Sequence, residues 1–568
     1  MDMTTISQPV EHAELDRMIG ELGVGARAWA ITSLYDREAL LLHVHESVRR
    51  HAAEWAETAI RIKGTPPSVA GEEWLAGPYV TMTALTEMAR TLAALASGGN
   101  PLDGIPVTQA PGGRIALQVV PHGRQQKVLL NGYTGEIWMP PGVGIDAARA
   151  TAGLGARHLD ENGGVGLVLG AGNATLIGPL DALYELVAFN RASVLKLNPT
   201  FTELLPVYQK AFAPLISRDL LRIINGDIET GTYVTHHPDI SHVHITGSEA
   251  THDAIVWGTG PEAQHRRANR DPLLTTPITS ELGGVSPIIV VPGKWSKADI
   301  AYQARQVATQ KLHNSGHNCI ASQTLILSSS WPQREQFLDA IRAVFDTLPP
   351  RDTWYPGSER KMAHAEHAYP AAERHSGRLL IKVDDAASDD LFRTEYFSPV
   401  LGYTMIPGTG ASYLRAAVRF ANERLVGTLG AGVIVAPRDR KKMGAAFDAA
   451  IADLRYGAIG INCWSATAYL SPVMTWGAYP GNTIDHVGSG IGVVHNTRLL
   501  ANTERSVIRG PFRPFPRSWF GGEASMSPEP PYLVTAKANT SAAKALTDYA
   551  ARPGWGSLPA VFKAMLFP

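Results

Sequence analysis

Apolar residues recur every three to four positions through much of the first hundred residues, a spacing typical of helices that bury one face. Two stretches show it most clearly, at 37–63 and 81–96. The pattern then changes to short apolar runs at 113–121 and 135–142, with an Asn-Gly turn signal between them. We therefore expect N-terminal helices that cover something larger, followed by a small β-element.

Beyond residue 160, apolar runs of strand length alternate with helical segments, which is the signature of parallel sheets. A first series of runs lies at 165–170, 193–197, 221–225 and 242–246. A second series lies at 287–291, 322–328, 399–406, 430–436 and 457–462. The two series predict two α/β domains that meet near the ELGG sequence at 281–284.

Composition narrows the class of protein. The 51 basic residues nearly balance the 52 acidic ones, so no global charge attracts the chain to nucleic acid or to an anionic membrane. No apolar run approaches the ~18 residues needed to cross a bilayer, and the N-terminus does not read as a signal peptide. With only two cysteines, Cys319 and Cys463, we expect a cytoplasmic protein whose partners are small molecules or its own copies.

Cys319 is a candidate nucleophile. It follows a turn marked by Asn314, Ser315 and Gly316 and precedes an apolar strand. An exposed junction between a loop and a strand suits a nucleophile. A lone cytosolic cysteine is more often a small buried hydrophobe, however, so the assignment needs support from elsewhere in the chain.

Two polar residues in other turns offer that support. Glu281 stands in a Gly-Gly turn before an apolar strand, where a carboxylate could activate water. Asn173 follows a buried strand in a glycine-rich turn, where its amide could donate a hydrogen bond to a developing oxyanion. Each feature alone is equally compatible with an ordinary turn.

Taken together and in order, such segments resemble the motifs of the aldehyde dehydrogenase superfamily. The resemblance spans about residues 160–465 and includes the N-x-G-x-x-C pattern of a nucleophile loop. The matching segments are LGAGN at 169–173, VLKLNP at 194–199, ITGS at 245–248, SELGG at 280–284, NSGHNCIA at 314–321 and TEYFSPVL at 394–401.

This resemblance implies a role for each matched residue. Cys319 would be the nucleophile, Glu281 the base that activates water, and Asn173 an oxyanion donor. NAD or NADP would be held by Lys196, Gly247, Ser248, Glu395 and Phe397. The reaction implied is oxidation of an aldehyde to a carboxylic acid through a thiohemiacetal and a thioester on Cys319, which water then hydrolyses.

The resemblance also names the parts of the expected α/β fold, which has two doubly wound, Rossmann-like domains and a small β oligomerisation element. Association into a homodimer or homotetramer is expected through that element. The predicted parts are N-terminal helices packed on the cofactor domain (1–112), the β-element (113–142), a cofactor-binding domain (143–283), a catalytic domain (284–490) and a C-terminal extension without an assigned task (491–568).

Several positions depart from the family pattern. Thr251 or His252 stands where the phosphate turn normally has a second glycine, and Pro199 replaces the glutamate common in members strict for NAD, so NADP is an open alternative. The long stretch 252–279 includes arginines that could meet a phosphate, although a solvated loop is the simpler interpretation. His317, two residues before Cys319, either favours the thiolate or fills space.

Other chemical interpretations of these side chains are weaker. His313, His317 and Cys319 could suggest a metal site, but no fourth ligand is evident nearby, and we expect no metal. His242 and His244 alternate on a predicted strand and are interpreted as surface or packing histidines. By the resemblance, Cys463 falls at the wall of a substrate channel with Trp464 and Trp476 beside it, and ordinary core packing is the alternative.

Two other functions remain open at this stage. In a related acyltransferring enzyme, coenzyme A rather than water takes the thioester, but such relatives usually lack the base that Glu281 supplies. The chain could also be a non-catalytic structural descendant of the fold, against which the joint retention of Cys319, Glu281 and Asn173 argues. Neither the aldehyde nor the choice between NAD and NADP follows from the sequence.

Overall fold

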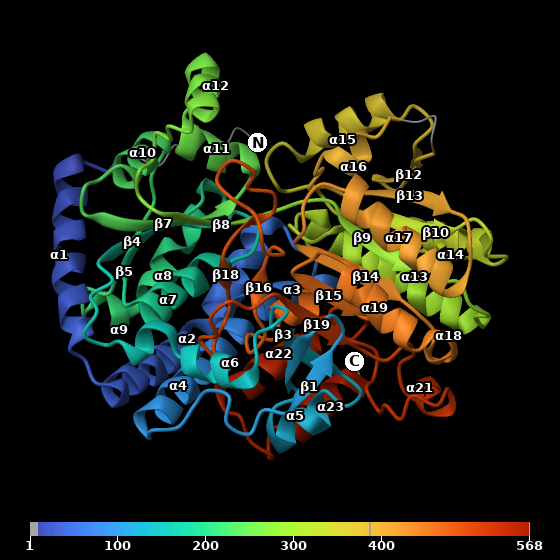
Figure 1. Cartoon of the computed structure of the whole chain (residues 1–568), viewed down its shortest axis with the longest axis horizontal. Coiled ribbons are helices and arrows are strands. Elements are labelled where there is room, and N and C mark those ends of the chain that lie inside the picture. The colour runs from blue at the N-terminus through green and yellow to red at the C-terminus, as the bar shows by residue number, and fades with distance from the viewer. Residues whose placement is uncertain (1–9, 385–387, 567–568) are drawn as a thin grey trace.

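Two sheets organise the chain, and the computed structural model describes residues 10–384 and 388–566 (Figure 1). The smaller sheet has six strands in the order β17-β8-β7-β4-β5-β6, parallel except for β17. Its strands are β4 (Val165–Leu169), β5 (Ala192–Lys196), β6 (Leu221–Ile224), β7 (Ile240–Gly247), β8 (Ile278–Leu282) and β17 (Gly490–Ile491).

Helices connect these strands, as parallel pairing requires. The chain runs from β4 outward through β5 to β6 and then returns to the other side of β4 for β7 and β8. A switch point therefore lies between β4 and β7. The connecting helices are α7 (Ile177–Phe189), η4 (Pro199–Leu204), α8 (Leu205–Ala211), α9 (Ala213–Ile216), α10 (Ile228–Thr235), α11 (Glu249–Trp257) and α12 (Gly260–Asn269).

The larger sheet has eleven strands, of which the seven from β19 to β12 are parallel. Its central strands are buried throughout, so both faces are covered. In sheet order the strands are β1 (Val107–Ala110), β2 (Arg114–Val120), β3 (Thr134–Trp138), β19 (Arg505–Arg509), β15 (Ala458–Ile461), β14 (Gly430–Ile434), β9 (Ser286–Val290), β10 (Ser322–Ser328), β13 (Val400–Ile406), β12 (Arg378–Lys382) and β11 (Glu373–His375).

The helices around this sheet connect its parallel strands. Among them, η5 leads from α13 into the loop that carries Cys319. These helices are α13 (Lys297–Leu312), η5 (His313–Gly316), α14 (Arg334–Thr347), α15 (Ser358–Ala368), α16 (Asp390–Arg393), α17 (Gly410–Arg424), α18 (Pro437–Met443), α19 (Ala445–Asp453) and α20 (Ala466–Tyr469).

The α/β fold class predicted from the sequence is confirmed, and the strands predicted from both alternating series are present. One local interpretation was wrong. The stretch 252–279 is not a solvated loop, because most of it forms α11 and α12, and α12 projects from the edge of the molecule (Figure 1). Gly258 and Pro261 break the helical run between these helices and make it read as a loop.

The N-terminal part is helical, as the periodicity predicts. In α2, the Ser33 side chain caps the first turn, and Gly64 ends the helix in the left-handed region at φ 58°. Helices α1 and α2 pack against the smaller sheet and its helices, whereas α3 reaches toward η5. The elements are α1 (His12–Ala30), α2 (Leu34–Lys63), η1 (Pro67–Val69), α3 (Gly71–Trp74), η2 (Leu75–Tyr79), α4 (Val80–Ala96), α5 (Gly123–Leu129), α6 (Ile145–Thr151) and η3 (Leu154–Arg157).

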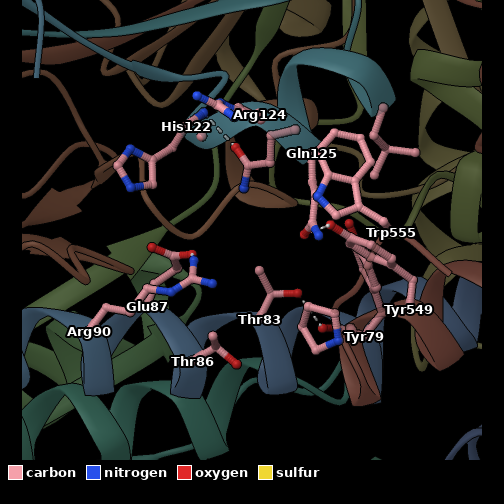
Figure 2. A pocket seen from close by; sticks show the side chains of 15 residues that line it. Tyr79, Thr83, Thr86, Glu87, Arg90, His122, Arg124, Gln125, Tyr549 and Trp555 are labelled. Atoms are coloured by element: carbon pink, nitrogen blue, oxygen red, sulfur yellow. Dashed lines mark hydrogen bonds and ion pairs between the residues drawn. The ribbon is translucent and has the colours of Figure 1, made fainter. Parts of the chain in front are cut away.

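The segment after residue 490 returns to both the sheet and the N-terminal helices. It supplies β19 to the larger sheet, and α22 packs beside α3 and α4. A cavity remains between α4, α5 and the C-terminal part (Figure 2). The remaining elements are β16 (Trp476–Gly477), β18 (Val493–Val494), α21 (Arg517–Phe520), α22 (Asn539–Ala551) and α23 (Leu558–Leu566). Within the described ranges, no helix combines the length and apolarity needed to cross a membrane.

Candidate active site

The Cys319 loop is held in a conformation that few sequences tolerate. Asn314, Ser315 and Gly316 have φ values of 54°, 55° and 80°, all in the left-handed region that favours Asn and Gly. A Cβ on Gly316 would lie 2.7 Å from the Ser398 carbonyl oxygen. The loop therefore needs its glycine, and its sharp turn presents Cys319 as a half-buried side chain just before β10.

Cys319 and Glu281 are in contact, although 38 residues separate them in sequence. The Cys319 Sγ donates to Glu281 Oε1 at 3.7 Å. Trp476 Nε1 donates to the same oxygen at 2.7 Å and fixes the carboxylate. Glu281 Oε2 is buried and has no hydrogen-bond partner among the described residues, so one carboxylate oxygen stays free to act.

These side chains line a cavity of about 60 Å³, large enough for a few water molecules. Asn173 and Trp464 line it with Cys319 and Glu281, and the rest of the wall is mainly apolar. Cys463, for which the resemblance implies the channel wall and core packing is the alternative, lies in the core with its Sγ directed at the Ile508 carbonyl. Core packing was the correct interpretation for Cys463, whereas Trp464 and Trp476 do line the cavity.

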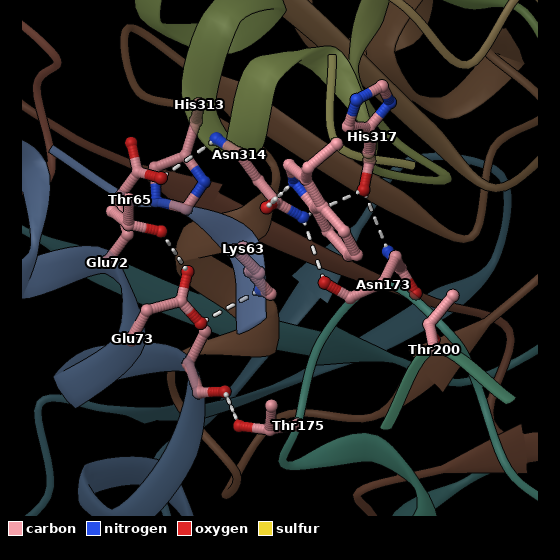
Figure 3. Close-up of polar contacts among 12 residues, drawn as sticks. Lys63, Thr65, Glu72, Glu73, Asn173, Thr175, Thr200, His313, Asn314 and His317 are labelled. Carbon is pink, nitrogen blue, oxygen red and sulfur yellow. Dashed lines mark hydrogen bonds and ion pairs between the residues drawn. The ribbon is translucent and has the colours of Figure 1, made fainter. Parts of the chain in front are cut away.

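A network of amide hydrogen bonds ties Asn173 to the Cys319 loop (Figure 3). The Asn173 Nδ2 donates to the His317 carbonyl at 3.0 Å. The Asn314 Nδ2 donates both to that carbonyl and to the Asn173 carbonyl, at 3.0 and 2.9 Å. Because an amide nitrogen carries two protons, Asn173 keeps a second N–H for the cavity.

The thiol and the carboxyl group are both shifted toward their neutral forms. Burial, and then the charges of Glu281 and Glu395, raise the pKa of Cys319 well above its usual range. Burial raises the pKa of Glu281 to about 7, with a further contribution from Asp181. A carboxyl group with a pKa near neutrality is suited to accept and release protons. Cys319 therefore rests as a thiol beside a base matched to physiological pH.

His317 does not supply a positive charge to the thiol. Burial lowers the pKa of His317 to about 3, so this imidazole is neutral near pH 7. Its Nδ1 lies 2.8 Å from the Phe397 carbonyl, and its ring packs near Phe397 and Tyr355. Of the two roles considered for His317, the structure supports packing.

Buried charged side chains of the N-terminal helices lie beside Asn314, in the turn that leads to Cys319 (Figure 3). Glu72 accepts a hydrogen bond from the Asn314 backbone N–H at 3.0 Å and pairs with Arg351 at 2.8 Å. Beside it, Lys63 pairs with Glu73 at 2.8 Å, and both side chains are almost fully buried. Burial alone would raise the pKa of Glu72, but Arg351 and His313 outweigh it and the net direction is downward.

Replacing Glu72 with alanine is expected to destabilise the protein. The change leaves the Arg351 guanidinium without its carboxylate and the Asn314 N–H without an acceptor. Breaking a buried ion pair in this way typically costs about 3–5 kcal/mol. Urea unfolding of Glu72→Ala should show that loss, whereas the exposed Glu57→Ala on α2 should unfold near the wild-type midpoint. An equal midpoint for the two variants would contradict the structural role of Glu72.

Two buried histidine–carboxylate pairs lie on β7, the strand next to Glu281. His244 pairs with Asp181 at 3.5 Å, and His242 pairs with Glu185 at 3.1 Å. Asp181 and Glu185 are four residues apart on α7, and His242 and His244 are two residues apart on β7. Both separations span about 6 Å, so each acid can face one histidine. Both histidines are thus packing residues, as interpreted, but they are paired with acids rather than lying at the surface.

The His244 pair acts on Glu281. Burial lowers the pKa of His244, but the Asp181 carboxylate outweighs it and the net direction is upward. The protonated form of His244 lowers the pKa of Glu281, opposing the effect of burial and of Asp181. His242 pairs instead with Glu185, at 3.1 Å.

Replacing His244 with glutamine is therefore expected to raise the pKa of Glu281, because the cation disappears while Asp181 remains. If deprotonated Glu281 is the working base, the acidic limb of the pH profile for turnover should move to higher pH. His242→Gln is the matched control and should leave that limb in place. A limb that moves equally in both variants, or in neither, would contradict the electrostatic coupling of His244 to Glu281.

The residues expected to bind the cofactor gather at one edge of the smaller sheet. Lys196 ends β5 and Gly247 ends β7, and Ser248 caps α11. In open α/β sheets, ligands bind at the carboxyl ends of the strands near a switch point. The Lys196 side chain is nearly buried and lies along Gly231, where a Cβ would come within 3.3 Å of it.

Glu395 reaches this edge from the segment after α16, whereas Phe397 lies against His317 and Tyr355. The Glu395 carboxylate lies over Gly283, just after β8, where a Cβ would come within 2.0 Å of Oε1. Burial raises the pKa of Glu395 to about 7, and its Oε1 has no hydrogen-bond partner within the described ranges. A free acceptor and the amine of Lys196 suit the hydroxyl groups of a dinucleotide, and the start of α11 suits its pyrophosphate.

The departures from the family pattern at α11 have a local explanation. The Ser248 hydroxyl accepts a hydrogen bond from the Thr251 N–H at 3.2 Å, so one donor at the helix start is already satisfied. Arg266 and Arg267 of α12 pair with Glu262 and Asp253 at 2.6 and 2.8 Å. These arginines are therefore engaged with acids rather than free for a phosphate.

No group of three or more His, Cys, Asp or Glu side chains suited to a metal ion occurs among the described residues. The three residues considered as metal ligands, His313, His317 and Cys319, lie in separate environments. The His313 ring lies tilted against Trp464, His317 contacts Phe397, and Cys319 contacts Glu281.

Comparison with known proteins agrees with this geometry. The family model for the aldehyde dehydrogenase family matches residues 164–364, a range that contains Asn173, Lys196, Glu281 and Cys319. By this match, residues 164–364 are similar to the aldehyde dehydrogenase superfamily, as are the curated relatives and solved structures described below. The solved structures of this superfamily extend the likeness beyond the matched range, since they cover both sheets.

Two solved aldehyde dehydrogenases illustrate the shared fold. Aldehyde dehydrogenase C from Pseudomonas syringae, solved with NAD+ and octanal, has a TM-score of 0.59 and 18% identity, covering 89% of this chain and 90% of that one. The NADP-dependent glyceraldehyde-3-phosphate dehydrogenase from Bacillus halodurans, solved with NADP, has a TM-score of 0.57 and 15% identity, covering 88% and 92%.

Curated aldehyde dehydrogenases match over shorter ranges. The rat aldehyde dehydrogenase family 3 member A2 is 23% identical over 279 residues, which is 46% of this chain and 52% of the relative. Coniferyl aldehyde dehydrogenase from a Pseudomonas strain is 34% identical over 224 residues, or 37% and 40%. The chain thus spans about half the length of the curated aldehyde dehydrogenases it matches.

Proposed function

We propose that this chain oxidises an aldehyde to a carboxylic acid with NAD or NADP, using Cys319 as the nucleophile. One observation carries the proposal. The Cys319 thiol is aimed at the Glu281 carboxylate inside a mainly apolar cavity that Asn173 also lines. This arrangement joins a nucleophile, a base with a pKa of about 7 and an amide donor.

The first step is thiol activation. Glu281 accepts the Cys319 proton, and the thiolate sulfur bonds to the aldehyde carbon while the carbonyl π electrons move to oxygen. The free N–H of Asn173 and the Cys319 backbone N–H donate to that oxyanion. NAD or NADP, when bound, accepts the hydride that the adduct releases, leaving a thioester.

The second step is hydrolysis. Glu281 must first release the proton taken from the thiol, for which its pKa near 7 is suitable. The Glu281 carboxylate then takes a proton from water, whose oxygen bonds to the thioester carbon. Collapse of this adduct breaks the carbon–sulfur bond and frees the carboxylic acid, and Cys319 regains its proton. Trp476 keeps Glu281 directed at the sulfur throughout.

The cofactor residues complete the proposal. Lys196 and Glu395 would hold the ribose hydroxyls of NAD or NADP, Gly247 and Ser248 would meet its pyrophosphate, and Phe397 would pack near its nicotinamide. The position of these residues at the carboxyl ends of β5, β7 and β8 supports this assignment. Residues 143–283 would then form the cofactor domain and 284–490 the catalytic domain.

We also propose that the protein acts as a homodimer or homotetramer, in the cytoplasm. β1 is an outer strand of the larger sheet, and Val107, Thr108 and Gln109 are exposed along it. An exposed edge strand offers unpaired backbone groups to a second copy. Sedimentation of the wild type tests this, and a purely monomeric protein would contradict it.

Turnover of the wild type tests the proposed reaction. We expect aldehyde-dependent reduction of NAD or NADP at a rate unaffected by coenzyme A, because Glu281 directs water to the thioester. The acid should appear in step with the reduced cofactor in product analysis. A rate that depends on coenzyme A, with an acyl-coenzyme A product, would overturn hydrolysis.

A further inference from the structure

Three cavities lie in series from Cys319 to the surface. The inner cavity holds Cys319, and a middle cavity of about 140 Å³ shares Leu75 and Leu470 with it. An outer cavity of about 350 Å³ shares Tyr79, Thr83 and Leu129, among others, with the middle one. The shared residues show that the inner cavity adjoins the middle one and that the middle cavity adjoins the outer one.

The middle cavity is an apolar passage. Its wall combines residues from opposite ends of the chain, because the segment 527–532, α22 and α23 close it against η2, α4 and α5. The apolar side chains around it include Leu75, Leu129, Leu130, Leu470, Leu546 and Met565. Such a passage favours hydrocarbon over water.

The outer cavity is polar and opens near exposed side chains (Figure 2). Arg90 and Arg124 line it together with His122, and the acid Glu87 is already bonded by Arg90. Arg498 lies close behind, since burial and then Arg498 lower the pKa of His122. Arg498 Nε and Nη2 have no hydrogen-bond partner among the described residues. The outer cavity therefore carries excess positive charge.

We propose that the substrate is an elongated apolar aldehyde with an anionic far end, such as an ω-oxo fatty acid. The aldehyde carbon reaches Cys319, the hydrocarbon fills the middle cavity, and the carboxylate meets the arginines of the outer cavity. From Val80 to Arg90, α4 runs beside this path for ten residues, or ~15 Å at 1.5 Å per residue. This length excludes small aldehydes from spanning both ends. The assignment rests on the proposed function of Cys319.

The hydrocarbon length of the aldehyde tests whether the substrate occupies the middle cavity. Wild-type kcat/KM should rise from acetaldehyde through hexanal to dodecanal. Leu129→Trp narrows the passage and should lower kcat/KM for dodecanal by about tenfold while sparing acetaldehyde. Val128→Trp is the matched control, because Val128 is exposed on the same helix and lines none of the three cavities. Equal kcat/KM for all three aldehydes, or equal losses in both variants, would overturn the passage.

The anionic far end of the proposed substrate can be tested by changing a charge in the outer cavity. The wild type should prefer 12-oxododecanoate to dodecanal, and Arg124→Glu should lower kcat/KM for 12-oxododecanoate by about fivefold, the size expected for one exposed ion pair. Lys127→Glu makes the same charge change on α5 outside the three cavities and should leave both substrates unaffected. A preference that survives Arg124→Glu would overturn the anionic end.

Acetaldehyde turnover separates failure of this inference from failure of the proposed function. If acetaldehyde is oxidised without any effect of chain length or charge, the elongated substrate is wrong and the Cys319 reaction stands. If no aldehyde of the series is oxidised by the folded wild-type protein, both are wrong.

Discussion

Replacing Cys319 with serine is expected to abolish aldehyde-dependent reduction of NAD or NADP. The serine hydroxyl is far less acidic than a thiol, so Glu281 with a pKa of about 7 cannot generate the nucleophile. Removing a nucleophile from a catalytic group that acts as a unit can cost on the order of 10⁶ in kcat. The rate of cofactor reduction, followed by absorbance, measures the effect.

Cys463→Ser is the matched control for that experiment. Cys463 is the other cysteine, it is buried, and its sulfur donates to the Ile508 carbonyl at 3.7 Å. This variant should keep the wild-type reaction. Similar rates for Cys319→Ser and Cys463→Ser would remove Cys319 from the mechanism.

Replacing Glu281 with glutamine is expected to stop turnover after the first cycle. The amide cannot take a proton from water, so the thioester should persist, and loss of a general base typically costs about 10²–10⁴ in rate. Glutamine also cannot take the thiol proton, but the negative charge that raises the pKa of Cys319 is removed, so the thiol loses its proton to water more readily and acylation continues at a lower rate. Rapid mixing should show a burst of one reduced cofactor per site without a steady rate.

Glu262→Gln provides the control for this second experiment. Glu262 lies on α12 and pairs with Arg266 far from the cavity wall, so its removal should leave steady turnover intact. Steady wild-type turnover by Glu281→Gln would show that another group activates water.

The strands and much of the site could be predicted because their signals are local. Runs such as 287–291 and 322–328 are apolar along their whole length, and burial on both faces of a parallel sheet requires this. Asn314, Ser315 and Gly316 signal a turn in the sequence, and the structure adds that a side chain at Gly316 would collide with Ser398. The order of the motifs along the chain also predicts that Cys319 and Glu281 belong to one site.

The contacts that hold the candidate catalytic side chains in place could not be predicted from the sequence, because they join segments that are far apart in the chain. Glu72 and Arg351 are 279 residues apart and look like surface charges until folding buries them together. The pKa of His317 depends on burial that no neighbouring residue signals. Likewise, the proline-rich segment 527–532 has no period, and its role as a cavity wall arises only from its packing against η2 and α4.

Mass analysis of the peptide that contains Cys319 tests the central claim most directly. Trypsin should release residues 312–334, which include Cys319 and no other cysteine. After Glu281→Gln is mixed with an aldehyde and NAD or NADP and quenched in acid, the account predicts this peptide with the mass of one acyl group added at Cys319. An unmodified peptide recovered after a full burst of reduced cofactor would contradict a thioester on Cys319.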